Sequence, residues 1–328
     1  MRETAMRRGG VNTARRTHVY GPVPSRRLGR SLGVDLVPFK TCTYDCLYCQ
    51  LGRTTRKTIQ RRMYVPVDEV LEDLDRALEA GPEPDYLCLA GSGEPTLHAG
   101  IGEVIRSIKR RTGIPLAVLT NGSLLWQKEV RDSLMGADLV LPSLDAGDRA
   151  SFQYVNRPHA GIPFERIIEG LIAFRKSFPG PVWLEVFLIA GATGTILAAD
   201  RIADQVHRIQ PERIQLNTVT RPPAEGYVFP VPVCLLENIR SLFGRRAEVI
   251  ADFSGAGDAG PRKVPARLIL SLLARRPCTL EDLAEGLGVH PMEAAKRLES
   301  LHKAGRIRIE QTGERLFYCA PAPNGRES

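Results

Sequence analysis

Three cysteines stand close together in one short segment of the chain. Cys42, Cys46 and Cys49 have the spacing C-x3-C-x2-C within the stretch TCTYDCLYCQ. Three thiolates on one loop can converge on a single metal centre. The remaining cysteines are isolated in the sequence, and we interpret them as inert thiols: Cys88, Cys234, Cys278 and Cys319. The odd total of seven argues against a disulfide framework.

The number of ligands bears on the kind of metal centre. Structural zinc is normally closed by four protein ligands, and no further Cys or Cys/His pair with suitable spacing supplies a fourth. Iron–sulfur clusters are usually held by four cysteines. Three cysteines would leave one iron open to a ligand from outside the protein. The spacing favours a cluster over zinc, and it leaves both alternatives open.

The segments that position this loop alternate between apolar runs and helical patterns. Apolar runs predict six strands, at 33–38, 86–91, 115–120, 138–144, 182–190 and 213–219. Helical spacing predicts helices at 67–78, 101–111, 124–135, 164–178, 196–209 and 235–243. This alternation indicates parallel β-α units, and near-continuously apolar strands indicate a sheet covered on both faces. We therefore predict an α/β fold.

Polar and glycine-rich residues follow the ends of five of these strands. In chain order they are the cysteine loop, Gly91-Ser92-Gly93-Glu94, Thr120-Asn121-Gly122, Ser143-Leu144-Asp145 and Asn217-Thr218. Each group alone is typical of an ordinary turn. The carboxyl ends of parallel strands share one edge of the sheet, where the chemistry of such folds is located. Five groups in register therefore predict a functional site at that edge.

Charge is distributed unevenly along the 328 residues. Residues 1–62 contain 14 Lys and Arg against 3 Asp and Glu, whereas residues 63–260 contain 19 against 26. A basic N-terminal segment followed by an acidic one indicates an anionic partner such as nucleic acid or phosphate. The alternative is that the basic segment only increases solubility. The hydrophobic fraction of 43% excludes a disordered polymer.

We expect five parts along the chain. They are a basic flexible N-terminus (1–16), an α/β domain (17–252), a linker (253–263), a small domain (264–320) and a tail (321–328). The basic N-terminus is followed by no apolar stretch typical of a secretory signal, and no apolar run is long enough to span a bilayer. We therefore predict a cytoplasmic protein without membrane contact.

The small domain has the pattern of a winged helix-turn-helix. Helices are predicted at 266–275, from Thr279 onward and at 291–304, followed by strands at 306–310 and 315–319. This fold often reads DNA with its third helix. That helix mixes basic and acidic residues, namely Lys296, Arg297 and Lys303 with Glu293 and Glu299. Docking of a protein or substrate is therefore the alternative to nucleic-acid binding.

At this point the sequence resembles the radical S-adenosylmethionine (SAM) enzymes, over roughly residues 17–250. The resemblance rests on the three-cysteine motif with Tyr48 before its last cysteine, and on the glycine-rich turn that ends in Glu94. It implies a partial (β/α)6 barrel with a [4Fe–4S] cluster on Cys42, Cys46 and Cys49. SAM would chelate the open iron through its amino and carboxylate groups. Reductive cleavage of SAM would yield a 5′-deoxyadenosyl radical that abstracts hydrogen, with flavodoxin or ferredoxin as the electron donor.

The resemblance also implies SAM-binding roles for residues at the predicted edge. Gly91, Ser92, Gly93 and Glu94 would line the amino group, with Glu94 an acceptor from the ammonium. Tyr48 would lie beside the adenine, Ser143 and Asp145 beside the ribose, and Asn121 against SAM. Each role has a structural alternative: a strand-to-helix turn, packing under the loop for Tyr48, a helix N-cap for Ser143 and Asp145, and a loop cap for Asn121.

Within the superfamily, several stretches are similar to the wyosine-forming tRNA modification enzymes. They are GPVPSRRLG followed by GVDLVP, then GSGEPTL, LTNGSLL, PSLDA and NRPH. Those enzymes rebuild a guanine beside the anticodon and carry a second cluster on upstream cysteines. This chain has no cysteine before Cys42 and departs from that pattern. The resemblance therefore implies the reaction type more firmly than the substrate.

Substrate-side candidates are mostly basic or amide residues near the expected mouth of the site. They are Arg26, Arg27, Asn156, Arg157, His159, Asn217 and Arg221. Arginines there could bind phosphate or carboxylate in a bidentate fashion. Ion pairing with acidic residues of the protein is the alternative for Arg26 and Arg27, and a structural role is the alternative for His159.

Three functions compete at this stage. The first is a radical SAM enzyme acting on an anionic substrate or on tRNA. The second is an activase or modifier of a partner protein or peptide, docked by the winged helix. The third is an iron–sulfur regulator that binds DNA. The completeness of the predicted SAM-binding edge favours an enzyme over a regulator.

Overall fold

The computed structural model of the chain describes residues 17–25, 27–250, 266–287, 289, 291–313 and 315–321. The predicted N-terminal segment 1–16, Arg26, the linker 253–263 and most of the tail lie outside the described residues. In the described part of the chain, no helix is long and apolar enough to cross a bilayer.

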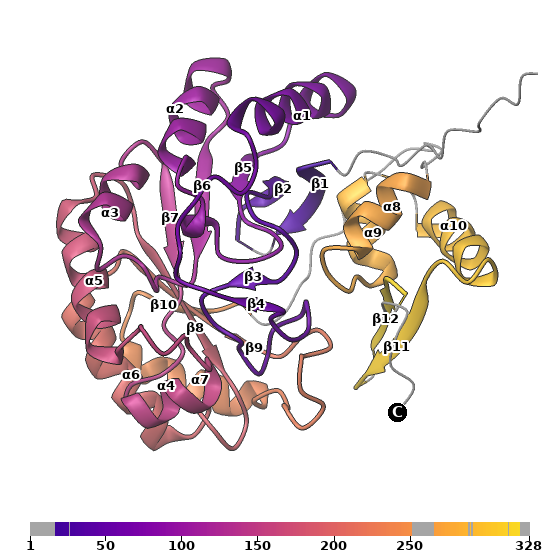
Figure 1. The fold of residues 1–328 in the computed structure, drawn as a ribbon. Coiled ribbons are helices and arrows are strands. Elements are labelled where there is room, and N and C mark those ends of the chain that lie inside the picture. Colours follow the sequence, from indigo (N-terminus) through magenta and orange to yellow (C-terminus); the bar gives the residue numbers. More distant parts are fainter. Residues whose placement is uncertain are drawn as a thin grey trace, which may run out of the picture.

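A curved, open, mixed sheet forms the centre of the molecule (Figure 1). A five-stranded part has the order β1-β2-β5-β6-β7 and a three-stranded part the order β10-β9-β8. Parallel bridges from Val140 to Val182 and from Ser143 to Glu185 continue the sheet from β7 to β8. The strands are β1 (Val19–Ser25), β2 (Gly29–Val34), β5 (Tyr86–Leu89), β6 (Leu116–Thr120), β7 (Leu139–Pro142), β8 (Trp183–Leu188), β9 (Arg213–Thr218) and β10 (Ala247–Val249).

Helices cover the outer face of this sheet (Figure 1). They are α1 (Val67–Ala80), α2 (Ile101–Arg111), α3 (Lys128–Leu134), α4 (Arg149–Val155), α5 (Phe164–Ser177), α6 (Ile196–Ile209) and α7 (Val233–Arg240). Their apolar residues recur at helical spacing, as Ile101, Val104, Ile105 and Ile108 do in α2, and all four are fully buried. The α/β class and the alternating order of elements are therefore confirmed.

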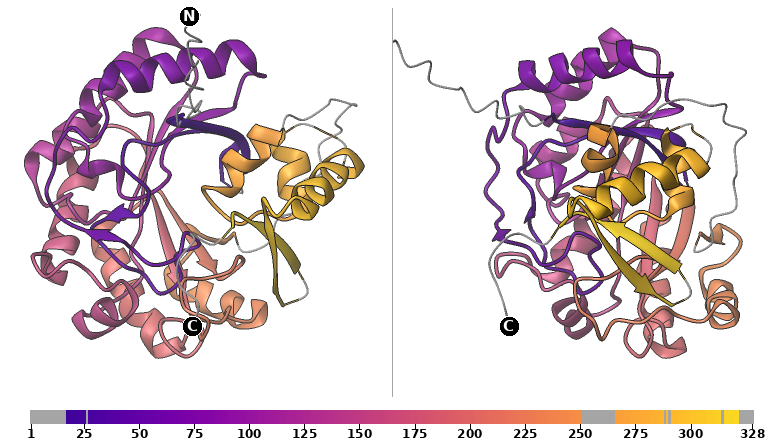
Figure 2. Two further views of the ribbon diagram at one scale, coloured as in Figure 1. Left: turned by 45° about the vertical axis from the view of Figure 1, so that its right-hand side comes forward. Right: turned by 90° about the vertical axis from the view of Figure 1, so that its right-hand side faces the viewer.

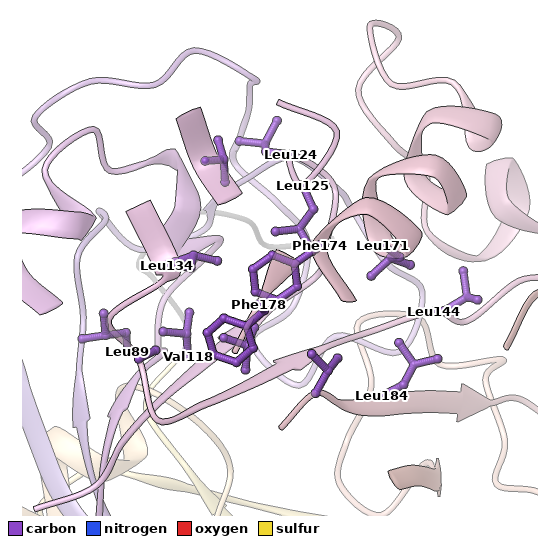
Figure 3. Close-up of a cluster of buried hydrophobic side chains, with 14 of the residues drawn as sticks. Leu89, Val118, Leu124, Leu125, Leu134, Leu144, Leu171, Phe174, Phe178 and Leu184 are labelled. Atoms are coloured by element: carbon purple, nitrogen blue, oxygen red, sulfur yellow. The ribbon is translucent and has the colours of Figure 1, made fainter. Parts of the chain in front are cut away.

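Aromatic and leucine side chains fill the core between helices and sheet (Figure 3). Phe174 of α5 stacks on Phe178 with ring centroids 4.9 Å apart. Leu134 of α3 and Leu184 of β8 belong to the same buried cluster. This packing explains why the apolar runs predicted the element types correctly.

The structure corrects several predicted boundaries. The first predicted strand, 33–38, is displaced, since β2 ends at Val34. The predicted helix 124–135 begins only at Lys128. The sequence did not predict β10, α4 or β1, which pairs antiparallel with β2. Pro22 and Pro24 lie in β1, where prolines are tolerated because β1 is an edge strand. With its antiparallel edge, the sheet is mixed and does not close into a barrel.

Residues 266–321 form a small C-terminal module of three helices and an antiparallel hairpin (Figure 1). Its elements are α8 (Ala266–Leu273), α9 (Leu280–Leu287), α10 (Pro291–Lys303), β11 (Arg308–Thr312) and β12 (Arg315–Cys319). The order of elements agrees with the prediction. Its apolar cluster includes Ile269, Leu283 and Leu298, and also Val23 of β1. The module and the α/β domain therefore share a core.

The C-terminal module lies at the open side of the curved sheet (Figure 2). On one edge, α9 packs against β1 so closely that a Cβ on Gly286 would lie 2.6 Å from Pro24 Cδ. On the other side, Asp282 of α9 pairs with Arg221, which follows β9, at 3.3 Å. The pair is almost fully buried. The module thus bridges the gap between the two edges of the sheet.

Candidate functional site

The three clustered cysteines occupy a loop in which each sulfur faces an N–H donor. The donor–sulfur pairs are Lys40 Nζ to Cys49 Sγ at 3.1 Å, Asn156 Nδ2 to Cys46 Sγ at 3.5 Å, and Asn121 Nδ2 to Cys42 Sγ at 3.6 Å. Donors of this kind stabilise negative charge on sulfur. Asn121 and Asn156 therefore support the cysteine loop, and the substrate role of Asn156 stays a prediction.

Burial raises the pKa of two of the cysteines, Cys42 and Cys46. It raises the pKa of Cys42 to about 12, with Glu94 adding to the effect, and it raises the pKa of Cys46 well above its usual value. Thiolates, not thiols, bind metals. Ligation at this loop must therefore release protons.

The glycine-rich turn is hydrogen-bonded to the backbone of the cysteine loop. The amide of Glu94 donates to Thr41 O at 3.1 Å, and the amide of Lys40 donates to Ser92 O at 2.7 Å. A Cβ on Gly93 would lie only 1.8 Å from Thr41 O. Glycine at this position therefore allows the turn and the loop to approach each other.

Glu94 ties three segments of the site together. Its carboxylate is 2% exposed and accepts from Thr96 N at 3.1 Å, Thr96 Oγ1 at 2.5 Å, Thr120 Oγ1 at 2.6 Å and Asn121 N at 2.8 Å. Burial raises the pKa of this carboxyl, and the four donors oppose that effect. The bonds assign Glu94 a structural role here, and its expected contact with the SAM ammonium stays a prediction.

Asp145 plays a similar role on the opposite side of the loop. It accepts hydrogen bonds from the Tyr48 hydroxyl, from Asn156 Nδ2 at 2.8 Å and from the amide of Phe187 at 3.0 Å. The ring of Tyr48 stacks on that of Phe187 with centroids 3.9 Å apart. Burial raises the pKa of Asp145 to about 6. Asp145 thus holds both Tyr48 and the Asn156 amide that faces Cys46.

The N-cap alternative for Ser143 and Asp145 is wrong. The residue that caps α4 is Asp148, whose side chain accepts from the amide of Ser151 at 2.8 Å. Ser143 instead continues the sheet, since its amide donates to Thr120 O at 3.1 Å. The ribose-binding role of this pair stays a prediction.

We predict that Asp145→Asn loosens the cysteine loop. The amide would turn a donor toward at least one of the three groups that donate to Asp145, at a cost of about 1–3 kcal/mol. Thermal unfolding should therefore shift downward, and iron content after reconstitution should fall. Asp132→Asn, at an exposed position paired with Lys128, is the control. Wild-type iron content and stability in Asp145→Asn would contradict this assignment.

Most substrate-side candidates have partners within the protein. Arg27 pairs with Glu185 at 3.0 Å, and Asn217 Nδ2 donates to the same carboxylate at 2.9 Å. Arg221 pairs with Asp282, as described above. The ion pair given as the alternative for Arg27 is present, and Arg221 is also ion-paired. The substrate roles of both arginines stay predictions. Arg26 lies outside the described residues.

Arg157 and His159 support the outer side of the loop. Arg157 pairs with Glu225 and donates to the Tyr227 hydroxyl at 3.0 Å. Arg53 pairs with the same Glu225 at 2.7 Å. The amide of His159 donates to Thr43 O at 2.8 Å, and its ring Nδ1 accepts from the amide of Gly161. These contacts agree with the structural alternative for His159.

A cavity of about 330 Å³ adjoins the cysteine loop. Six of the predicted residues line it: Arg27, Tyr48, Cys49, Gly91, Asn217 and Arg221. Other lining residues had no assigned role, among them Tyr20, Gln50, Glu185, Phe187 and Arg276. Cys88, interpreted from the sequence as an inert buried thiol, is buried and also lines the cavity. Glu185 is a charged residue inside the apolar run 182–190, and this unusual position could have indicated a site residue. No feature of the sequence indicated Arg276, which comes from the C-terminal module.

The described residues fit an iron–sulfur cluster. They contain no three His, Cys, Asp or Glu side chains close enough to bind a single metal ion. A cluster does not need such a group, because each cysteine ligates a different iron. Three sulfurs with N–H donors, and a cavity beside Cys49, provide the ligands and the space for one open iron.

Comparison with known proteins agrees with this geometry. Residues 36–196 match the family model of the radical SAM superfamily. The chain belongs to the radical SAM superfamily. Radical SAM proteins are enzymes that use a [4Fe–4S] cluster and SAM, so the predicted enzyme class and cofactors are confirmed. They generally need a reductant such as flavodoxin or ferredoxin.

The relatives of this radical SAM protein include members of the UPF0026 family, to which the chain belongs. It is 35% identical over 295 residues to the UPF0026 protein of Methanocaldococcus jannaschii, covering 88% of this chain and 87% of that protein. A UPF0026 protein of Helicobacter pylori is 34% identical over 318 residues, covering 92% and 97%. A protein of Brachyspira hyodysenteriae named GTPase Obg is 37% identical over 304 residues, and the chain spans 45% of its length.

Solved structures support the radical SAM fold. A radical SAM methyltransferase from Sphaerobacter thermophilus has a TM-score of 0.53 at 18% identity, covering 67% of this chain and 65% of that chain. Streptococcus suis SuiB bound to S-adenosylmethionine has a TM-score of 0.51 at 13% identity, covering 67% and 50%. At these identities the likeness concerns the fold alone.

Proposed function

We propose that this radical SAM enzyme cleaves SAM reductively at the cavity beside Cys49 and abstracts hydrogen from a small anionic substrate bound in the same cavity. The observation that carries the proposal is the position of this cavity, which touches Tyr48 and Cys49 of the cysteine loop and Gly91 of the glycine-rich turn. When bound, the cluster and SAM supply one electron and the 5′-deoxyadenosyl radical.

The protein's own contribution is to bind the cluster, to orient SAM and the substrate, and to shield them from solvent. Cys42, Cys46 and Cys49 are the cluster ligands, and the N–H donors at their sulfurs favour the reduced state. The contact between Gly93 of the glycine-rich turn and Thr41 fixes the distance between this turn and the cysteine loop. Tyr48 is held by Asp145 and Phe187, so its ring forms a rigid side of the cavity. Such preorganisation is what a radical reaction requires of its site.

Nucleic-acid docking by the C-terminal module receives less support. On α10, Arg297 pairs with Glu293 and Lys303 with Glu299. A protein that binds DNA or RNA strongly needs a face of unneutralised positive charge. The tRNA substrate and the DNA-binding regulator are therefore secondary hypotheses, and no specific contact favours a partner protein or peptide.

The proposal predicts that hydrogen comes from a small molecule. Extract from cells grown in deuterated medium would be separated into small molecules, RNA and protein, and each fraction incubated anaerobically with reduced enzyme and unlabelled SAM. We expect deuterated 5′-deoxyadenosine with the small-molecule fraction. Deuterium transfer only from the RNA or the protein fraction would contradict the proposal and favour one of the alternatives.

A further inference from the structure

The C-terminal module is connected to the glycine-rich turn through buried charges. Arg275 follows the end of α8 and pairs with Asp35 at 3.3 Å, and both side chains are about 5% exposed. Asp35 in turn accepts from the amide of Ser92 at 3.1 Å and from the Ser92 hydroxyl. A Cβ on Gly91 would lie 2.8 Å from Asp35 Cγ. The C-terminal module therefore helps to position the glycine-rich turn.

Three arginines line the cavity against one glutamate. Arg27 is neutralised by Glu185, and Arg221 is paired with Asp282. Arg276, contributed by the module, donates to Pro24 O at 3.3 Å. Its Nε is buried and has no hydrogen-bond partner among the described residues. The Asp282 carboxylate lies near enough to interact with Arg276 electrostatically, but its ion pair in the described part of the chain is with Arg221.

Such an arrangement is costly unless an anion completes it. Arginine stays protonated in proteins, so a guanidinium kept partly from water needs compensation by a negative charge. Burial lowers the pKa of Arg221, and the nearby positive charge of Arg276 lowers it further. The Asp282 carboxylate opposes this effect and acts on both arginines. Two guanidinium groups that share one carboxylate retain a net positive charge, and this charge favours an oxyanion in the cavity that both arginines line.

We propose that Arg276 binds the carboxylate or phosphate group of a small-molecule substrate in this cavity. The inference rests on the proposed function, because it takes the occupant to be the molecule that loses hydrogen. The occupant is small because the module that supplies Arg276 also fills the open side of the sheet, leaving about 330 Å³ beside Cys49. If SAM binds the open iron through its carboxylate, as the family resemblance implies, Arg276 would be available to the substrate.

The inference is tested by titrating inorganic phosphate, as the simplest oxyanion probe, into the full-length, cluster-loaded protein by calorimetry. Arg276→Gln should weaken phosphate binding about tenfold or more, because a hydrogen-bonded charge is lost. Arg276→Lys keeps the positive charge but lacks the bidentate guanidinium group. Its phosphate affinity should therefore lie between those of wild type and Arg276→Gln. Arg267→Gln, an exposed arginine on α8 of the same module, is the matched control and should bind like wild type.

Binding of phosphate, SAM and bulk tRNA to the Arg276 variants distinguishes the possible roles of this residue. Phosphate affinity that is unchanged in folded Arg276→Gln and Arg276→Lys would overturn the inference. A variant that binds SAM more weakly while binding phosphate normally would assign Arg276 to the SAM carboxylate and also overturn it. Weakened binding of bulk tRNA with unchanged phosphate binding would assign it to a polynucleotide instead.

The titration uses no reductant, so its result is independent of SAM cleavage. Failure of 5′-deoxyadenosine formation with normal phosphate binding would remove the proposed function alone. Normal SAM cleavage with phosphate binding that does not depend on Arg276 would remove this inference alone.

Discussion

Replacing Cys42, Cys46 or Cys49 with alanine is expected to abolish cluster assembly and to lower 5′-deoxyadenosine formation by more than about 100-fold. Mutation of groups that merely support a metal ligand typically costs 10–100-fold, and loss of a ligand costs more. The three sulfurs are the loop's only thiols, and each has its own N–H donor. Iron and sulfide content, visible absorption and product formation measure the effect.

Cys234→Ala provides the control for this series, because that thiol is exposed and far from the loop in sequence. It should retain wild-type iron content and SAM cleavage. Retention of a full cluster in any one of the three loop variants would show that the cysteine concerned is not a ligand.

Gly93→Ala is expected to have the second large effect. Its new methyl group would lie 1.8 Å from the backbone oxygen of Thr41, and neither segment can yield without breaking the hydrogen bond from Glu94 N to Thr41 O. Overpacking of this kind costs about 1–3 kcal/mol or more. We expect a lower thermal unfolding midpoint and loss of most SAM cleavage, because the turn and the loop are forced apart.

The matched control for Gly93→Ala is Gly113→Ala. Gly113 is exposed, and an added Cβ there would meet no atom within 4 Å. That variant should have the thermal unfolding midpoint and the rate of SAM cleavage of the wild type. If Gly93→Ala also behaves like wild type, the close contact between the turn and the loop is not required for function.

The sequence predicted the local elements well, because periodicity depends on neighbours in the chain. The six parallel strands and the order of helices follow from apolar spacing, as the fully buried stripe of α2 illustrates. The edge strand β1 was missed because Pro22 and Pro24 are typical of turns, and only its position at the sheet edge explains their presence in a strand.

The site was predictable where it rests on motifs and unpredictable where it rests on contacts distant in sequence. The cysteine spacing alone predicts Cys42, Cys46 and Cys49 as the cluster ligands. By contrast, the bonds from Tyr48 and Asn156 to Asp145 join residues from different segments, and they give these residues a role in supporting the loop that the sequence did not predict. Arg276 lies more than 200 residues from Cys49 in sequence, and only the docking of the C-terminal module brings it to the same cavity.

The most direct test of the central claim is the quantification of 5′-deoxyadenosine. The protein would be reconstituted anaerobically with iron and sulfide, reduced with dithionite and supplied with SAM. We expect 5′-deoxyadenosine and methionine in equal amounts, and none without dithionite. Absence of 5′-deoxyadenosine, together with tight stoichiometric zinc in the isolated protein, would contradict the assignment of this site to radical SAM chemistry.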